Sequence, residues 1–317
     1  MSTDSLTFED NALFSDLCGP HDTHLLLIES KLGVELLARG NTITLKGGGE
    51  ARTQARAALE ALYARLQQGL PITNADVEAA LRLTAHGALA GISEKQTLTL
   101  PRRTITPRSA AQGVYLNQLS QNELVFGVGP AGTGKTYLAV AHAALSLLKG
   151  EVERLILSRP AVEAGERIGF LPGDMKDKVD PYLRPLYDAL YDVLHTDFVD
   201  RRIAAGEIEI APLAFMRGRT LSRAVVILDE AQNATIAQMK MFLTRLGEGS
   251  RMVVTGDPSQ TDLPEAGLSG LGDALGLLHN INGVAVTRFT GEDVVRHRLV
   301  KEIVQAYDAR SQLSPSS

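Results

Sequence analysis

Gly129-Pro130-Ala131-Gly132-Thr133-Gly134-Lys135-Thr136 is the stretch that decides the fold of this 317-residue chain. It fits the phosphate-loop pattern G-x-x-x-x-G-K-[ST] and stands between an apolar strand pattern at 124–128 and a helical pattern that begins at Lys135. Glycines allow backbone N–H groups to curl around a polyphosphate, and the N-terminus of the following helix adds partial positive charge. We therefore expect Lys135 to reach the β and γ phosphates of a nucleotide and Thr136 to ligate Mg²⁺.

A second motif is a buried strand pattern that ends in two acids, Val225-Val226-Ile227-Leu228-Asp229-Glu230. In a doubly wound sheet this end of the strand faces the ligand crevice. Two carboxylates there would be costly if they were buried without a cation, so the alternatives are a bound metal ion or a hydrated rim. With the phosphate loop 93 residues upstream (229 − 136), we expect Asp229 to hold the magnesium shell and Glu230 to orient or deprotonate the attacking water.

A third motif, Thr255-Gly256-Asp257-Pro258-Ser259-Gln260, follows the apolar stretch at 252–254. Because this strand is expected to end beside the strand of the two acids, we expect Gln260 to contact the γ-phosphate or the attacking water. Asp257 precedes a proline, which favours a turn residue over a catalytic one.

Strand and helix patterns alternate on both sides of these motifs. Strands are predicted at 124–128, 154–158, 208–210, 224–228, 251–255 and 284–288, and helices at 135–149, 235–246, 271–279 and 292–306. This alternation predicts an α/β fold, in which a parallel sheet is covered by helices on both faces.

The N-terminal third predicts a separate small α+β domain at 16–90, with a helix–strand–strand–helix order. Residues 1–15 are acidic and polar, and we expect them to be loosely ordered, as we do the tail at 311–317. Prolines and alternating threonines at 91–107 indicate a linker, after which the phosphate-loop domain is expected to occupy 108–310.

The composition, with 44% hydrophobic and 22% charged residues, is typical of a globular protein and holds no run long enough for a membrane span. The first twenty residues contain four acids and no Lys or Arg, and Cys18 is the single cysteine. Both features favour a cytoplasmic protein.

The net charge of −5 argues against a surface that is basic throughout, so a polyanion site would have to be local. Three local basic clusters are Arg102/Arg103/Arg108, Arg217/Arg219/Arg223 and Arg296/His297/Arg298/Lys301, each of which is either a binding site or a solvated face.

Taken together, the motifs resemble those of the PhoH family of bacterial ATPases over about residues 104–310. The resemblance lies in the phosphate loop and in four further segments: 158–166 with 169–173, 216–220, 229–233 and 255–260. It implies ATP and Mg²⁺ as cofactors and a core similar to the first motor domain of superfamily 1 helicases, a RecA-like fold. It also implies that Gln112 reads adenine, because an amide can pair with both N6 and N7 of that base.

Helicases of this type complete their site with an arginine from a second motor domain, and only 57 residues (317 − 260) follow Gln260. We therefore expect a homo-oligomer, a ring such as a hexamer, in which an arginine of one subunit reaches the γ-phosphate bound by its neighbour. Arg296 is our candidate for this catalytic arginine, and Arg217 and Arg219 are the alternatives.

The domain at 16–90 resembles the KH fold, which relatives in the PhoH family also carry. Its Gly-x-x-Gly segment reads Gly19-Pro20-His21-Asp22, in which the acid would repel an RNA phosphate. Two interpretations stay open for this domain: RNA binding, and a structural or oligomerisation role.

The segment at 165–191 is long for a connection, and its tyrosines, Tyr182, Tyr187 and Tyr191, are either core residues or a stacking platform for single-stranded bases. Arg159 and Glu166 are further candidates for positions near the site.

The sequence as a whole predicts an ATPase coupled to RNA binding, remodelling or processing. The competing hypothesis is an ATP-gated protein-assembly or signalling module without nucleic acid, and a small-molecule kinase is disfavoured because Glu230 beside Asp229 suits activation of water.

Overall fold

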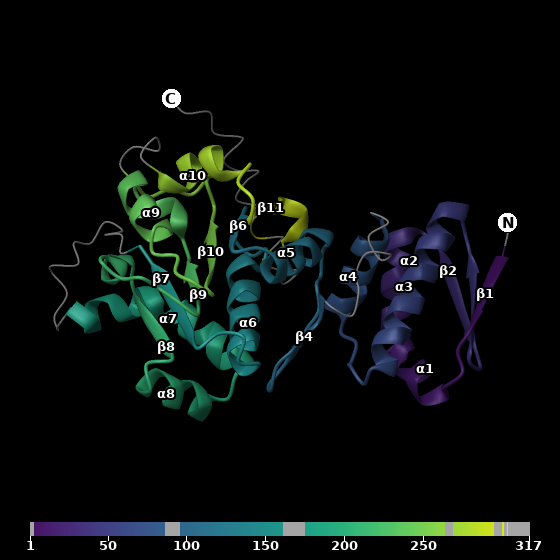
Figure 1. Ribbon diagram of the computed structural model, residues 1–317. Helices are drawn as coiled ribbons and strands as arrows, with labels where there is room; N and C mark the ends of the chain where they lie inside the picture. Colours follow the sequence, from purple (N-terminus) through teal and green to yellow (C-terminus); the bar gives the residue numbers. More distant parts are fainter. Residues whose placement is uncertain are drawn as a thin grey trace. The chain divides into compact units, whose positions relative to one another are not determined.

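The computed structural model describes residues 3–85, 96–160, 175–263 and 269–294, together with residues 300 and 303. The chain forms two compact units (Figure 1). Unit 1 comprises Met1–Thr99 and Thr104–Val114, and unit 2 comprises Leu100–Arg103 and Tyr115–Ser317.

Unit 2 is built on a six-stranded sheet in the order β11-β6-β10-β9-β7-β8, and every neighbouring pair of strands is parallel. The strands are β6 (Leu124–Val128), β7 (Arg154–Arg159), β8 (Ile208–Pro212), β9 (Ala224–Leu228), β10 (Arg251–Gly256) and β11 (Val284–Arg288). All residues of β6 and β9 are buried, as expected for central strands covered on both faces. The predicted α/β fold is confirmed, and the predicted bounds of β6, β9 and β11 agree with the structure.

Helices cover both faces of this sheet. Because side chains alternate along a strand, one set, which includes Phe126, Val226 and Val254, packs with residues of α9, α10 and the 3-10 turn η5 in one hydrophobic core. The opposite face is covered by α6, which contacts β6, β7, β9 and β10. The helices are α5 (Ala110–Gln121), α6 (Lys135–Leu148), α7 (Met175–Val193), α8 (Thr196–Ala204), α9 (Ile236–Leu243) and α10 (Gly270–Leu278), and η5 spans Leu213–Met216. No helix in the part of the chain that the structure describes has the combined length and hydrophobicity of a membrane span.

The predicted last helix at 292–306 begins differently from the prediction. Residues Gly291–Asp293 form a 3-10 turn, η8, in which the Thr290 side chain and the Asp293 side chain cap each other's backbone. The next residue, Val294, has an extended backbone with φ −67° and ψ 119°, so the turn ends where the pattern predicted that a helix continues. Arg296, His297, Arg298, Lys301 and the tail at 311–317 lie outside the described residues.

Unit 1 contains a three-stranded antiparallel sheet in the order β1-β3-β2, backed by helices. Its elements are β1 (Thr3–Thr7), α1 (Asn11–Cys18), α2 (Thr23–Leu32), β2 (Glu35–Arg39), β3 (Thr42–Lys46), α3 (Gly49–Gln67) and α4 (Asn74–Ala85). Leu17, Ile28, Ile43, Leu45 and Leu59 are fully buried in its core.

The expectation that residues 1–15 are loosely ordered is wrong for residues 3–15, the part of this segment that the structure describes. Residues 3–7 form β1 and pair with β3 from Thr3↔Lys46 to Thr7↔Thr42. Leu6 and Phe8 are buried in the core, and the Asp10 side chain accepts hydrogen bonds from two backbone N–H groups of the first turn of α1. Two apolar side chains and one helix cap thus order a segment whose overall composition is polar.

The loop between α1 and α2 is the predicted Gly-x-x-Gly-like segment. Gly19 has φ 76°, and His21 and Asp22 also adopt left-handed conformations, with φ 52° and 58°. Cys18, just before this loop, is buried, and burial together with the nearby Asp22 charge raises the pKa of its thiol to about 11.

The predicted linker at 91–107 contains a short antiparallel ribbon of β4 (Leu98–Thr99) and β5 (Thr104–Ile105). Within unit 1, the Arg65 side chain of α3 donates hydrogen bonds to Pro71 O at 3.0 Å and to Thr106 Oγ1 at 2.8 Å. Residues 86–95 lie outside the described residues.

Candidate phosphate and metal site

The phosphate loop connects β6 to α6, as the motif predicts. Gly129 has φ 145°, and a Cβ added there would lie 2.4 Å from Phe289 O, so a side chain does not fit. Gly129 N also donates a hydrogen bond to Gly256 O at 3.0 Å, which ties the loop to the end of β10. Lys135, the first residue of α6, is buried, and its Nζ donates a hydrogen bond to Pro130 O at 3.2 Å.

Asp229 is the most enclosed charged group of the site, with 0% of its surface exposed. Its Oδ1 accepts hydrogen bonds from Thr136 Oγ1 at 2.6 Å and from Thr255 Oγ1 at 2.7 Å. The sequence-predicted pair of Thr136 and Asp229 is therefore brought together, although 93 residues separate the two positions.

Arg159 neutralises the other oxygen of the same carboxylate. Its Nε and Nη2 lie 2.8 and 2.5 Å from Asp229 Oδ2, and Nη1 donates to Tyr182 O at 3.1 Å. A buried carboxylate requires such compensation, because desolvation of an unpaired charge costs several kcal/mol. The same guanidinium lies 3.8 Å from Glu230 Oε1, so one arginine contacts both acids.

Strand register explains why these groups meet. Ser158 pairs with Leu228 on one side of β9, and Val254 pairs with Leu228 on the other. The next residue of each strand is Arg159, Asp229 or Thr255, so the three side chains gather at the carboxyl edge of the sheet. This edge is where ligands bind in open α/β sheets.

The oxygens around Asp229 fit a hard divalent cation such as Mg²⁺. The Thr136 hydroxyl and the Asp229 carboxylate are adjacent oxygen donors of the type that Mg²⁺ prefers. Glu230 differs from Asp229, because its side chain is 46% exposed and its backbone is left-handed at φ 52°. The two neighbouring acids thus occupy different environments, which suits one for metal binding and the other for contact with water.

Tyr115 of α5 packs against β6, the strand that precedes the phosphate loop. Its ring packs edge-on against Phe289, with the ring centroids 5.4 Å apart, and a Cβ added at Gly127 would lie 2.7 Å from its hydroxyl oxygen. Burial, together with the Asp229 charge, raises the pKa of the Tyr115 hydroxyl, so this group stays protonated at neutral pH.

The loop after β10 carries Asp257 and Gln260. Asp257 Oδ1 accepts hydrogen bonds from the backbone and the hydroxyl of Ser259, at 3.0 and 2.7 Å, as expected of a turn residue. The residue is nevertheless buried, and its Oδ2 has no hydrogen-bond partner among the described residues. Gln260 is exposed at the end of this turn, where Gln260 N donates to Asp257 O at 3.0 Å.

Gln112 lies near the start of α5 and is buried. Its Oε1 accepts a hydrogen bond from Arg108 N at 2.7 Å, and its backbone N–H donates to Ser109 Oγ at 3.3 Å. Both contacts lie within unit 1, and the bond from Arg108 N holds the side-chain amide in one orientation.

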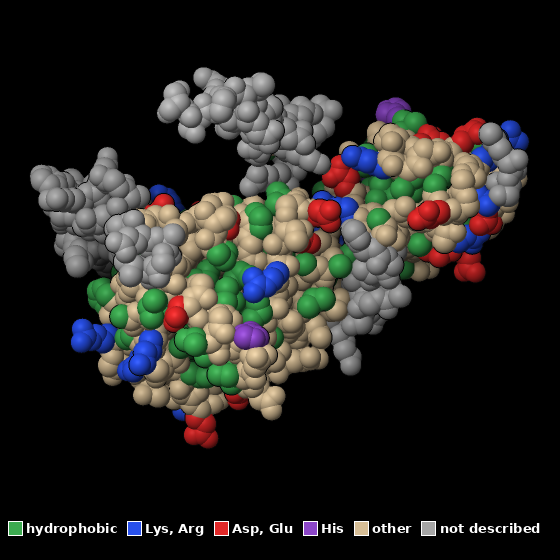
Figure 2. All heavy atoms as spheres, turned by 90° about the horizontal axis from the view of Figure 1, so that it is seen from above, with side chains coloured by type: hydrophobic (Ala, Val, Ile, Leu, Met, Phe, Trp, Pro, Cys, Tyr) green, Lys and Arg blue, Asp and Glu red, His purple; other side chains and the backbone are tan. Residues whose placement is uncertain are grey.

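Two of the basic clusters are largely paired with acids or carbonyls. Arg103 lies 3.0 Å from Asp192, Arg219 lies 2.6 Å from Glu209, and Arg223 lies 3.1 Å from Glu153. On the face drawn in Figure 2, the described Lys and Arg side chains are scattered among acidic and hydrophobic ones. Exposed ion pairs of this kind contribute little energy and leave less positive charge for a polyanion.

Tyr187 and Tyr191 of α7 stack on each other, with ring centroids 6.4 Å apart and an interplanar angle of 27°. Both are half-buried, and the Tyr191 hydroxyl donates to Asp200 Oδ1 at 2.9 Å. Packing within the unit therefore occupies at least part of their surface. Of the predicted long connection, residues 165–174, which include Glu166, lie outside the described residues, and the remainder belongs to α7.

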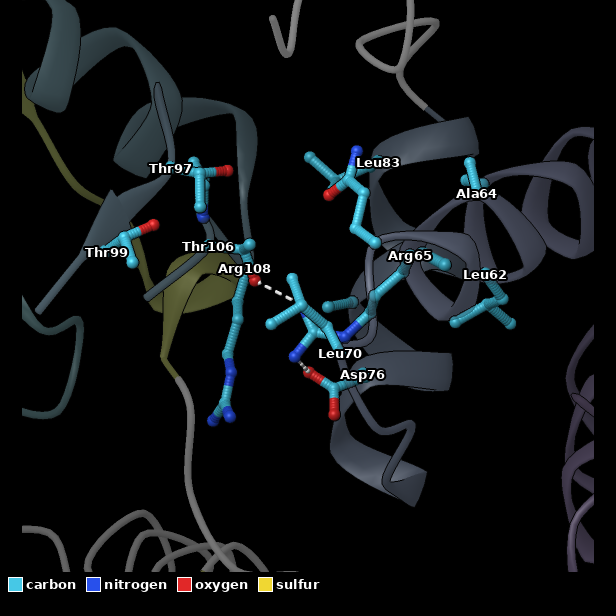
Figure 3. A pocket seen from close by; sticks show the side chains of 15 residues that line it. Leu62, Ala64, Arg65, Leu70, Asp76, Leu83, Thr97, Thr99, Thr106 and Arg108 are labelled. Atoms are coloured by element: carbon cyan, nitrogen blue, oxygen red, sulfur yellow. Dashed lines mark hydrogen bonds and ion pairs between the residues drawn. The ribbon is translucent and has the colours of Figure 1, made fainter. Parts of the chain in front are cut away.

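Among the cavities lined by described residues of unit 1 are one of about 500 Å³ and one of about 490 Å³. In the larger one, Arg65 of α3 lies between Asp76 of α4 and Thr106, and it makes an ion pair of 3.6 Å with Asp76 (Figure 3). These charges satisfy each other, which is typical of a structural contact. The smaller cavity is lined in part by Asp16, Gly19, Pro20, His21 and His24, and thus borders the Gly-x-x-Gly-like loop.

Sequence reasoning did not identify Thr255 or Gln232 as site residues, and it placed Arg159 only near the site. The Gln232 side chain is buried and donates to Glu230 Oε2 at 2.6 Å. Arg159 and Thr255 could have been identified from the sequence, because each is a polar residue near the end of a buried strand. Gln232 carried no such signal, because its contact depends on how the chain turns after Glu230.

The chain is similar over most of its length to proteins of one named family. The family described as "PhoH-like protein" matches residues 104–308. The PhoH-like protein of Bacillus subtilis (strain 168) is 49% identical over 306 residues, or 95% of each chain. The PhoH-like protein of Synechocystis sp. is 44% identical over 307 residues, or 94% of this chain and 92% of that protein. Protein PhoH of Escherichia coli (strain K12) is 48% identical over 205 residues, or 64% of this chain and 58% of that protein. Among solved structures, the chain is similar to a Sulfolobus solfataricus SWI2/SNF2 ATPase core in complex with dsDNA. The TM-score is 0.32, and the identity is 14% over 52% of this chain and 34% of that chain. This likeness is too weak to support any conclusion about the fold beyond the observed order of the strands.

Proposed function

The chain belongs to the PhoH family of P-loop ATPase-like proteins, and from this membership we propose that it is a magnesium-dependent ATPase coupled to RNA binding, remodelling or processing. One observation carries the ATPase part of the proposal. Thr136 of the phosphate loop bonds directly to the buried Asp229, while Glu230, the next residue, remains half exposed. This arrangement separates a metal-holding acid from a water-activating one.

Each site residue then has a distinct role. The backbone of 129–134 and the ammonium group of Lys135 bind and orient the β and γ phosphates. Thr136 and Asp229 would hold Mg²⁺, which when bound neutralises phosphate charge. Glu230 orients or deprotonates the attacking water, and Gln260 contacts that water or the γ-phosphate.

We assign adenine recognition to Gln112. Its Oε1 is held by Arg108 N, so the amide is pre-oriented, and a fixed amide discriminates between bases better than a mobile one. This role makes ATP the preferred nucleotide.

RNA is the proposed partner of the same protein, and unit 1 supports this part of the proposal. Its helix–loop–helix order at α1 and α2 supports the resemblance to the KH fold, in which such a loop binds a nucleic-acid backbone, and a cavity borders the segment at 19–22. The exposed Asp22 opposes phosphate binding there, so the affinity of this loop for RNA is expected to be low.

A homo-oligomeric ring, for example a hexamer, remains our proposal for the source of the transition-state arginine. Arg296 is the candidate residue, and it lies outside the described residues. Mixing Arg296→Ala subunits with Lys135→Ala subunits should restore part of the activity if the arginine acts across an interface. A monomeric active enzyme in light scattering would contradict this arrangement.

The test of the proposed function is ATP turnover measured with and without single-stranded RNA, in Mg²⁺ and in EDTA. We expect turnover that requires Mg²⁺ and rises several-fold with RNA. Turnover that does not respond to RNA would favour the ATP-gated protein-assembly module. Turnover no higher than that of Lys135→Ala would overturn the ATPase proposal.

A further inference from the structure

Gln232 lies between the water-facing acid and the loop after β10. Its side chain is 2% exposed. Its Nε2 donates a hydrogen bond to Glu230 Oε2 at 2.6 Å, and its Oε1 accepts one from Asp257 N at 3.0 Å. One amide group therefore connects Glu230 to the backbone of the residue that follows β10.

The orientation of this amide is determined by its surroundings. The Asp257 N–H can only donate, so it selects the oxygen of the Gln232 amide and leaves the nitrogen facing Glu230. The space is also tight, because a Cβ added at Gly256 would lie 2.7 Å from Gln232 Oε1. A bond from an amide to a carboxylate is charge-assisted and stronger than one between neutral groups.

The turn that carries Gln232, η6 (Ala231–Asn233), is fastened by its other polar groups to the same loop and to Ser269, the N-cap residue of α10. Gln232 O accepts hydrogen bonds from Thr261 Oγ1 at 3.3 Å and from Ser269 Oγ at 2.9 Å. The Asn233 side chain donates to Asp262 Oδ2 at 3.2 Å and accepts from Asp262 N at 2.9 Å. The turn and the loop at 257–262 are thus expected to move together.

Glu230 needs such support more than an ordinary surface acid does. Its left-handed backbone conformation is unfavourable for a residue with a long side chain, and such strain persists only where surrounding contacts impose it. Its side chain is 46% exposed, so without a fixed partner it would sample several rotamers.

We propose that Gln232 is a positioning residue that orients the Glu230 carboxylate toward the attacking water and couples this orientation to the loop at 257–262. Gln260 lies on that loop, so its contact with the terminal phosphate transmits nucleotide state to Glu230 through the Gln232 amide. The inference rests on the proposed ATPase function and identifies a regulatory contact within the same site.

The test compares Gln232→Met, which keeps the length of the side chain and removes both hydrogen bonds, with Asn233→Ala, which releases the bonds to Asp262 and leaves Glu230 untouched. For Gln232→Met, kcat should fall roughly 10-fold to 100-fold, the scale of general-base positioning, while KM and the affinity for a fluorescent ATP analogue change less than about threefold. Asn233→Ala should lower kcat by less than about threefold. Gln232→Asn, which keeps the amide on a shorter side chain, should fall between Gln232→Met and the wild type, and it provides the test if Gln232→Met does not fold.

A second measurement separates positioning from a merely structural role. In the Glu230→Gln background, Gln232→Met should lower single-turnover rates by less than about twofold, because the base it orients is already absent. An equal loss in both backgrounds, or a folded Gln232→Met protein with wild-type kcat, would overturn the inference. Absence of ATP turnover in the wild type would instead show that the proposed function itself had failed.

Discussion

The phosphate loop of unit 2 and the Gly19-Pro20-His21-Asp22 loop of unit 1 share a backbone plan and differ in charge. Each contains glycine with positive φ and leads into a helix, α6 or α2. At the start of α6 stands Lys135, whereas the residue before α2 is an exposed Asp22 in a left-handed conformation. From this comparison we predict that helix N–H groups alone do not make a phosphate site, because the local side-chain charge decides whether an anion is attracted.

The largest expected effect comes from removing Lys135, the cation of the phosphate loop. Lys135→Ala should lower ATP turnover by ~10³-fold or more and weaken nucleotide binding, because charge on the β and γ phosphates loses its partner in an enclosed site. Lys149→Ala, at the exposed end of α6, is the matched control and should leave turnover unchanged. Steady-state kinetics and nucleotide titration measure both effects, and turnover within a few-fold of the wild type would contradict the phosphate-loop assignment.

The next largest effect concerns the acid that has no counterpart in the unit 1 loop. Glu230→Gln should retain binding of ATP with Mg²⁺ and lower turnover by roughly 10²-fold or more, the usual scale for a lost general base. The amide is of the same size, so folding should be preserved. If nucleotide binding were lost instead, Glu230 would be a metal ligand, and the roles of Glu230 and Asp229 would have to be exchanged.

A smaller effect is expected from Gln112, whose contacts lie in unit 1. Gln112→Ala should reduce the preference for ATP over GTP by about tenfold, the discrimination that a bidentate amide provides. It should also lower the free energy of unfolding by about 1 kcal/mol, because the hydrogen bond from Arg108 N is lost. Competition between the two nucleotides in turnover assays measures the first effect, and an unchanged preference would remove the adenine-reading role.

The smallest effect tests the unit 1 loop directly. Asp22→Asn should raise the affinity of the full chain for single-stranded RNA by roughly twofold to fivefold at low salt, because it removes an exposed charge and asparagine tolerates the left-handed backbone. Glu50→Gln, on an exposed position of α3, is the control. Fluorescence anisotropy at two salt concentrations checks this prediction.

Binding that weakens steeply with salt would indicate phosphate contacts. An affinity that depends on neither Asp22 nor salt would favour the structural or oligomerisation role of unit 1. The two loops would then differ in function as well as in charge.

The sequence predicted the strands of unit 2 closely and those of unit 1 less well, for physical reasons. Central parallel strands are continuous apolar runs, so β6 and β9 could be delimited to the residue. By contrast, β1 contains a single buried residue, Leu6, and its order comes from pairing with β3, a partner about 40 residues away in the sequence. Local pattern carries no information about such a partner.

The same distinction applies to the site. Thr136, Asp229 and Glu230 could be named because each belongs to a local motif. Thr255 and Arg159 contact Asp229 only because β10 and β7 flank β9 in a given register, and strand order cannot be read from an apolar run. Gln232 depends on a turn that reverses through a left-handed glutamate, which no local pattern signals.

The buried thiol of Cys18 makes the chain convenient for site-specific spectroscopy. Because burial raises the pKa of this group to about 11, the reactive thiolate is a minor species at neutral pH. Cys18 is the only cysteine in the sequence, so a cysteine introduced at an exposed position such as Lys149 would react far faster with a maleimide dye. A single fluorophore could thus be attached to either unit of a protein that keeps its native cysteine, and two such sites would report the distance between the units during turnover.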